Sequence, residues 1–103
     1  LSTAWDVSTA SYLQNFDVSA EENSPQGIFF KPDGTKMYIT GNNVGKVNEY
    51  NLSTAWDIST ASYVQDFSLL QQVRSPNSVF FEPNGTKMYI LGSFFDAVWS
   101  YDL

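Results

Sequence analysis

The chain has 103 residues, of which 43% are hydrophobic, 17% aromatic and 16% charged, and eleven acidic against five basic side chains give a net charge of −6. This length fits one domain, and the aromatic content excludes a disordered chain. The acidic balance argues against binding to nucleic acid or an anionic membrane, and no apolar run reaches the roughly 18 residues of a membrane-spanning helix. Because the chain has neither Cys nor His, it lacks the commonest metal ligands and the commonest general base. We therefore expect no cofactor.

An internal repeat organises the chain. Residues 1–6, Leu-Ser-Thr-Ala-Trp-Asp, return at 52–57, and residues 34–39, Gly-Thr-Lys-Met-Tyr-Ile, return at 85–90, a shift of 51 residues in both cases. A period of this length is typical of repeat architectures. We therefore divide the single unit 1–103 into repeat 1, residues 1–51, and repeat 2, residues 52–102.

The predicted elements are all strands and turns. In chain order, strands are expected at 11–17, 28–31, 36–40, 46–51 and 62–68, with three more between residues 78 and 102. The runs Pro32-Asp33-Gly34 and Pro83-Asn84-Gly85 suit type I turns in which each glycine takes the following left-handed position. Since residues 28–30 and 37–39 are apolar on both sides, we expect sheets that are covered on both faces.

Each repeat resembles the bacterial YVTN-type propeller repeat. The resemblance rests on a proline, a short apolar strand, a Pro-Asp/Asn-Gly turn and a Tyr-containing second strand, at Pro25, 28–30, 32–34 and 37–39 and again at Pro76, 79–81, 83–85 and 88–90. It implies an all-β fold of β-propeller blades, each with four antiparallel strands A to D counted outward, and two blades per chain. The chain order is then D-A-B-C-D-A-B-C. The shared motifs are turn chemistry, so they imply a fold and no reaction.

This strand order leaves one end with a spare strand and the other one strand short. The D strand at 11–17 has no sheet before it, and the last blade has no D strand after it. Because blades become stable only when stacked, we expect a homo-oligomeric ring in which the N-terminal strand of one chain completes the last blade of another. The strand partners are Ser11, Tyr12, Leu13, Gln14, Asn15 and Phe16 with Val98, Trp99 and Tyr101.

Two blades per chain make the blade number even. A homotrimer of six blades is favoured and a homotetramer of eight is next, because bulky residues near the axis argue against a four-blade ring. These residues are Phe29, Phe30, Phe80 and Phe81.

One face of such a ring carries loops that differ between the repeats. The candidate ligand-face residues are Glu21, Glu22, Asn23, Asn42, Asn43, Arg74, Phe94 and Phe95. Glu21 and Glu22 are expected to point apart and stay solvated. Phe94 and Phe95 either begin a strand and are buried between blades or form an apolar contact point on the face. A glycan or another surface ligand stays open as a partner.

The Trp-Asp pairs at 5–6 and 56–57 look like the dipeptide of WD40 repeats. In this chain the pair lies in the connection between strands C and D, and the His of WD40 repeats is absent, so we do not favour that family. Instead, we expect Trp to fill a gap between blades and Asp to cap a turn with the Ser and Thr that follow.

The function predicted is a non-catalytic, self-assembling scaffold or binding module. A lactonase-like propeller hydrolase is the first alternative, but the inner strands offer only Lys31 and Glu82 toward a catalytic channel. A fragment or engineered form of a longer repeat protein is the second, because the repeats are very similar and no initiator Met is present.

Overall fold

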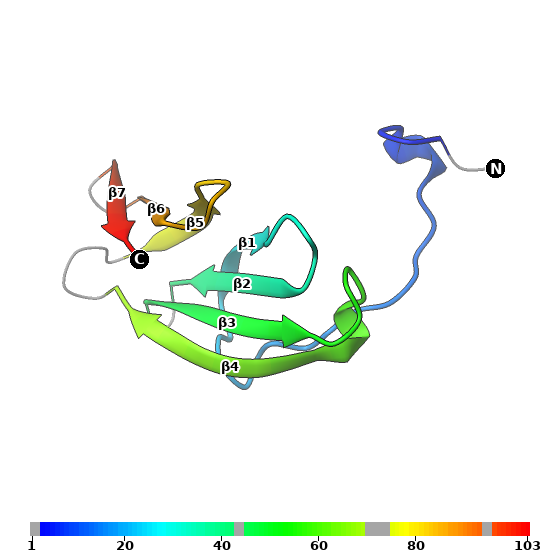
Figure 1. Ribbon diagram of the computed structural model, residues 1–103, viewed down its shortest axis with the longest axis horizontal. Coiled ribbons are helices and arrows are strands. Elements are labelled where there is room, and N and C mark those ends of the chain that lie inside the picture. The colour runs from blue at the N-terminus through cyan, green and yellow to red at the C-terminus, as the bar shows by residue number, and fades with distance from the viewer. Residues whose placement is uncertain (1–2, 43–44, 70–74, 94–95) are drawn as a thin grey trace.

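The computed structural model describes residues 3–42, 45–69, 75–93 and 96–103 (Figure 1). In this part of the chain the regular elements are strands and two 3-10 turns, which confirms the all-β prediction. They are η1 (Val7–Thr9), β1 (Pro25–Phe30), β2 (Lys36–Gly41), β3 (Lys46–Leu52), η2 (Ile58–Thr60), β4 (Ala61–Ser68), β5 (Pro76–Phe81), β6 (Lys87–Gly92) and β7 (Ala97–Asp102). Among the residues described, no helix is long and apolar enough to cross a membrane.

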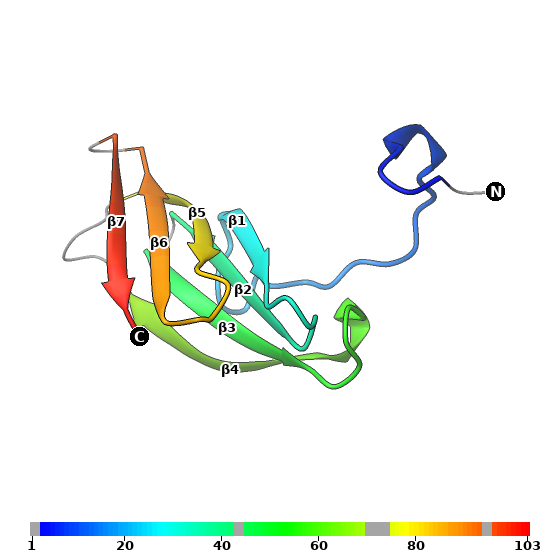
Figure 2. The same cartoon turned by 45° about the horizontal axis from the view of Figure 1, so that its top comes forward.

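The strands form two antiparallel sheets, which lie side by side in Figure 2. The N-terminal sheet has the order β1-β2-β3-β4, and the C-terminal sheet has the order β5-β6-β7. The pairing of β5 with β6 is that of β1 with β2 shifted by 51 residues, including the register shift that follows Pro25 and Pro76. Apart from the segment 11–17, the expected strands are present with small changes at their ends, since β1 stops at Phe30 and β3 continues to Leu52.

The hairpin turns between β1 and β2 and between β5 and β6 confirm the predicted glycine conformation. Gly34 has a φ of 75° and Gly85 a φ of 73°. The Gly34 N–H donates to the carbonyl of Lys31, and the Gly85 N–H donates to that of Glu82, both at 2.7 Å. Only a residue without a Cβ takes this left-handed position at no steric cost.

Two apolar clusters stabilise the sheets. One lies between them and consists of Val47, Leu69, Val79, Phe81, Met88 and Ile90. The other lies on the opposite face of the N-terminal sheet and consists of Met37, Ile39, Tyr50 and Leu52, with Phe16 and Val18 packed against it. The N-terminal sheet therefore has apolar packing on both faces, whereas the clusters cover the C-terminal sheet on one face.

Within the single chain, the two-sided burial expected for stacked sheets is present in the N-terminal sheet and absent from the C-terminal sheet. Burial alternates along β5 and β6, so that Val79 and Phe81 are buried while Phe80 and Leu91 are exposed. Alternation of this kind marks a sheet with one covered face. The sequence pattern describes a sheet with two neighbours, and the described part of a single chain supplies one.

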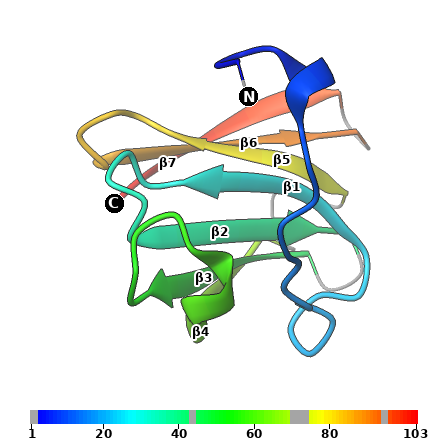
Figure 3. The same cartoon turned by 90° about the vertical axis from the view of Figure 1, so that its right-hand side faces the viewer.

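The expected strand at 11–17 is also not formed. Residues 10–18 carry no regular structure and lead from η1 to the N-terminal sheet, where Phe16 and Val18 pack (Figure 3). A strand needs a hydrogen-bonding partner, and β4 already occupies the outer edge of this sheet. The segment therefore has the residue pattern of a β-strand but pairs with no other strand in the described chain.

The chain exposes more surface than a closed domain of its size. Its accessible surface is 6749 Å² and its radius of gyration is 14.5 Å. A compact monomer of this mass has about 5,800 Å² and about 12.8 Å. The difference reflects the projecting N-terminus and the uncovered sheet face.

Candidate assembly surfaces

The N-terminal segment, residues 3–18, is held against the N-terminal sheet at one end only. The Phe16 ring meets the Tyr50 ring edge-on, with centroids 5.9 Å apart at 81°. The Gln14 amide donates a hydrogen bond of 2.9 Å to Asp57. Beyond Gln14 the chain leaves the sheet, and Trp5 at its far end is fully exposed.

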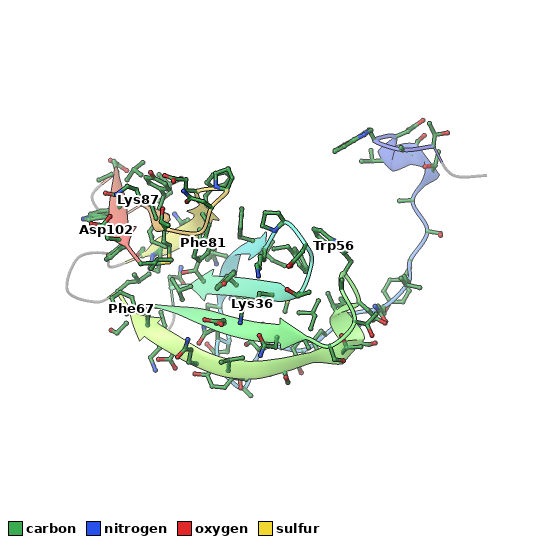
Figure 4. All side chains as sticks on the ribbon, in the orientation of Figure 1. Lys36, Trp56, Phe67, Phe81, Lys87 and Asp102 are labelled. Carbon is green, nitrogen blue, oxygen red and sulfur yellow. The ribbon has the colours of Figure 1, made fainter. Side chains whose placement is uncertain are left out.

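The same aromatic contact occurs 51 residues later. Phe67 of β4 meets Tyr101 of β7 edge-on, with centroids 5.8 Å apart at 76°. Phe67 lies at the end of β4 that is next to the C-terminal sheet (Figure 4). Thus Phe16 lies on the N-terminal sheet as Phe67 of β4 lies on the C-terminal sheet. The segment occupies the place that the outer strand of a preceding sheet would take.

In the described part of the chain, strand β7 is paired on one side only. Its counterpart β3 pairs with both β2 and β4, whereas β7 pairs with β6 alone. The Leu103 N–H donates to Thr86, toward β6. Because N–H directions alternate along a strand, those of Asp102, Ser100 and Val98 point to the free edge. A free edge of this kind is a template for another strand.

Apolar side chains line the uncovered face of the C-terminal sheet. The cross-strand pairs of Phe80 with Tyr89 and of Leu91 with Val98 place these residues on one face. Val98 is 66% exposed and Phe80 57% exposed. Their counterparts in the N-terminal sheet, Phe29 and Val47 among them, pack in the cluster between the sheets. The uncovered face therefore has the composition of a buried one.

The short turns at η1 and η2 confirm the capping role expected for Asp6 and Asp57, whereas Trp5 is fully exposed and fills no gap within the chain. Asp6 accepts hydrogen bonds from the N–H and hydroxyl of Ser8, and Asp57 does the same for Ser59. These hydrogen bonds hold the pKa of each carboxyl below its usual value, and the bonds from side chains contribute most. Sequence reasoning missed that the preceding Trp5 and Trp56 have φ values of 67° and 66°, since no local motif marks a bulky left-handed residue.

The candidate ligand-face residues are only partly described. Asn43, Arg74, Phe94 and Phe95 lie outside the described residues. Asn23 and Asn42 are exposed, and the Asn42 N–H donates to the carbonyl of Ser24. No arrangement of these residues for a ligand follows from their described members.

Glu21 and Glu22 accept hydrogen bonds from different partners, and the expectation that both stay solvated is wrong. Glu22 is 1% exposed, and its Oε2 accepts a 2.9 Å hydrogen bond from the Ser24 N–H. It lies against Gly41, where a Cβ would come within 2.5 Å of the Glu22 carboxyl carbon. Glu22 is thus a structural group of its loop, enclosed because Gly41 leaves room for it.

Glu21 joins the same loop to β3. It accepts a 2.8 Å hydrogen bond from the Tyr50 hydroxyl. Burial, followed by this hydrogen bond, raises the pKa of Tyr50 well above its ordinary value. The neutral phenol therefore anchors the loop next to the place where Phe16 packs.

Glu49 links three strands of the N-terminal sheet and provides a pH prediction. Its carboxylate accepts hydrogen bonds from Lys36 at 2.8 Å and from Gln65 at 3.0 Å. Burial pushes the pKa of Glu49 up, but these bonds and the Lys36 charge outweigh it and the pKa is lowered. A lowered carboxyl pKa stabilises the fold above the unfolded-state value, and this stabilisation is lost as pH falls through the folded-state value.

We therefore expect Glu49→Gln to lose most stability, relative to the native chain, above about pH 5, with the difference shrinking below about pH 4. Urea unfolding followed by circular dichroism across this range measures it. A difference that stays constant with pH would contradict the assigned role.

Among the described residues, no group of three or more Asp or Glu side chains is placed to hold a metal ion. No protein-family model matches the chain, and no curated protein matches it. The best-defined features of the molecule are therefore two surfaces at opposite ends, an unpaired strand sequence and an unpaired strand edge.

Proposed function

We propose that this chain is a non-catalytic, self-assembling β-propeller scaffold whose copies join head to tail. Residues 11–17 of one copy add to β7 of another and complete a four-stranded blade. The observation that carries the proposal is the matching pair of contacts Phe16–Tyr50 and Phe67–Tyr101, with almost equal distances and angles. These contacts support an arrangement in which the N-terminal segment packs on its own N-terminal sheet and serves as the fourth strand of the C-terminal sheet of a neighbouring copy.

The register of β3 with β4 predicts the register between copies. Within the chain, Asn51 pairs with Ser62 and Glu49 with Gln65. Shifting β3 forward and β4 back by one repeat places Asp102 opposite Ser11 and Ser100 opposite Gln14 of a second copy. The free N–H groups of β7 then receive carbonyl partners, as in any antiparallel ladder.

The sheet faces at the two ends are complementary in the same way. Between the sheets, the Phe81 ring packs on Tyr38 at 4.3 Å and on Phe29 at 5.3 Å. Shifting these contacts by one repeat of 51 residues predicts that Tyr89 and Phe80 of one copy pack on Phe30 of the next copy. Burying this exposed apolar surface supplies the driving force.

The contact is heterologous, so it closes into a ring when the rotation divides the circle. Three chains with six blades are our favoured number, and four chains with eight blades the next. Light scattering of the 103-residue chain tests this directly. We expect a mass of three or four times 11.6 kDa. A folded monomer at tens of micromolar would overturn the proposal.

Disulfide trapping tests the register. The chain has no Cys, so Ser11→Cys with Asp102→Cys gives one defined pair. Both positions are exposed, and the Lys87–Asp102 ion pair that is lost is a surface contact of small value. Directly opposed residues meet the Cα separation of a disulfide, about 4.4–6.8 Å.

On mild oxidation we expect covalent ladders up to the size of the ring. The matched control is Ser11→Cys with Ser100→Cys, which sits two residues out of register at about 7–8 Å and should cross-link far less. Equal cross-linking of the two pairs would contradict the strand addition.

A further inference from the structure

Trp56 shows how a tryptophan of this repeat is bound. Its indole packs on the Phe30 ring at 5.4 Å, and the backbone N–H of Trp56 donates a 2.9 Å hydrogen bond to the Gly34 carbonyl. A Cβ on Gly34 would lie 2.4 Å from the indole nitrogen. Position 34 therefore requires glycine for two reasons: its φ is left-handed, and the Trp56 ring occupies the space of a Cβ.

The C-terminal sheet has the same backbone frame, which is a left-handed glycine in the hairpin turn and a leucine N–H that donates to the threonine after it. No indole of the described residues packs there. Gly85 repeats the φ of Gly34, yet among the described residues nothing lies within 4 Å of a Cβ built there. Leu103 donates to Thr86 as Leu52 donates to Thr35. The frame that binds Trp56 in the N-terminal sheet thus recurs in the C-terminal sheet with its tryptophan position open.

A cavity of about 360 Å³ adjoins this position. The turn at 31–33 forms one wall and the turn at 82–85 the other, with Phe81 and Leu103 also among the lining residues. Figure 4 places Phe81 between the sheets and Trp56 at the opposite end of the N-terminal sheet. We call the site formed by Phe81, Gly85 and this cavity the tryptophan notch.

Trp5 has the matching features of an occupant. It is 102% exposed, and its φ of 67° is that of Trp56. The hydrogen bonds that shape residues 54–60 recur in residues 3–9, including the pair between Thr3 and Thr9. The indole is therefore presented on a turn that is already formed, which lowers the cost of ordering it on binding.

We propose that Trp5 binds in the tryptophan notch of a second copy, against Gly85 and Phe81. This rests on the proposed function, because strand addition to β7 delivers the N-terminus of the neighbour to this place. The chain's own Trp5 is far away, since the N-terminus and β7 lie at opposite ends in Figures 1 and 2. An aromatic side chain that passes from full exposure into such a site carries a large share of an interface's affinity.

Two single variants damage opposite halves of the same contact. Trp5→Ala removes the indole and keeps the notch, whereas Gly85→Ala keeps the indole and puts a methyl group where Gly34 tolerates none. Light scattering and sedimentation across about 0.1–100 µM measure assembly. Each variant should raise the concentration for half-assembly at least about tenfold.

Leu13→Ala is the matched control for Trp5→Ala. Leu13 is an exposed apolar residue of the same segment, and its counterpart Val64 is the unpaired residue at the register shift of β4. We expect this control to assemble like the native chain. Loss of assembly equal to that of Trp5→Ala would overturn the specific role of the indole.

Mixing the two variants gives the decisive result. An equimolar mixture contains one intact tryptophan, on the Gly85→Ala chain, and one intact notch, on the Trp5→Ala chain. We expect a 1:1 heterodimer from two chains that are separately monomeric, which also shows that both are folded. If Trp5→Ala assembles like the native chain, the tryptophan inference is overturned and the ring stands. If the native chain is itself monomeric, the proposed function falls.

Discussion

Replacing Ser100 by proline is expected to leave the protein folded and monomeric. Ser100 is exposed in the middle of β7. Its N–H points away from β6, by alternation from the Leu103 N–H that donates to Thr86. Proline is tolerated on an edge strand where its missing N–H faces solvent. The same substitution removes the donor at the centre of the proposed ladder and places a ring in the path of the incoming strand.

Ser100→Ala is the matched control, because it removes the hydroxyl and keeps the N–H. We expect circular dichroism of both variants to match the native chain. By sedimentation, Ser100→Ala should assemble normally, whereas Ser100→Pro should need at least about a hundredfold higher concentration, given the loss of backbone pairing. Normal assembly of the proline variant would show that β7 is not the edge that copies use.

The sequence predicts the turns and the strands that close locally. Pro32 presets one backbone angle of its hairpin turn and Gly34 takes the left-handed one, so that turn is specified by adjacent residues. The same holds for the turn capped by Asp57, whose partner Ser59 is two residues away. Where the interaction partners are neighbours in sequence, pattern and structure agree.

Features that depend on distant partners could not be predicted in the same way. Glu22 is buried because Gly41, the last residue of β2, leaves space for it. The strand sequence at 11–17 stays unpaired because β4 already pairs with β3. A residue pattern states what a segment can pair with and does not state whether a partner is present.

The candidate assembly residues show both sides of this distinction. The repeat itself indicates that residues 11–16 and β7 are counterparts of a paired strand and its edge. The position of Phe16 on Tyr50 is a tertiary contact that only the structure provides. The exposed indole of Trp5 and the open frame at Gly85 likewise become visible only by comparison with Trp56 and Gly34.

The two hairpin glycines provide the second large expected effect. Gly34→Ala and Gly85→Ala introduce the same methyl group at almost the same φ, 75° and 73°. Each variant loses about 1–2 kcal/mol from the left-handed backbone alone. At Gly34 the new Cβ would also lie 2.4–2.5 Å from three atoms of the Trp56 indole. The ring has to move off Phe30 or the turn has to open, and overpacking of this kind costs about 1–3 kcal/mol more.

Both substitutions are best compared in the Ser100→Pro chain, so that assembly does not contribute to the measured stability. Urea unfolding should give a larger loss for Gly34→Ala than for Gly85→Ala, by about 1–3 kcal/mol. Adding Trp56→Ala to each should remove that difference, because the methyl group at Gly34 then meets no indole and only the equal backbone strain remains. Equal losses for the two glycines with Trp56 in place would mean that the indole does not hold the position described for it, and the notch at Gly85 would then lose its template.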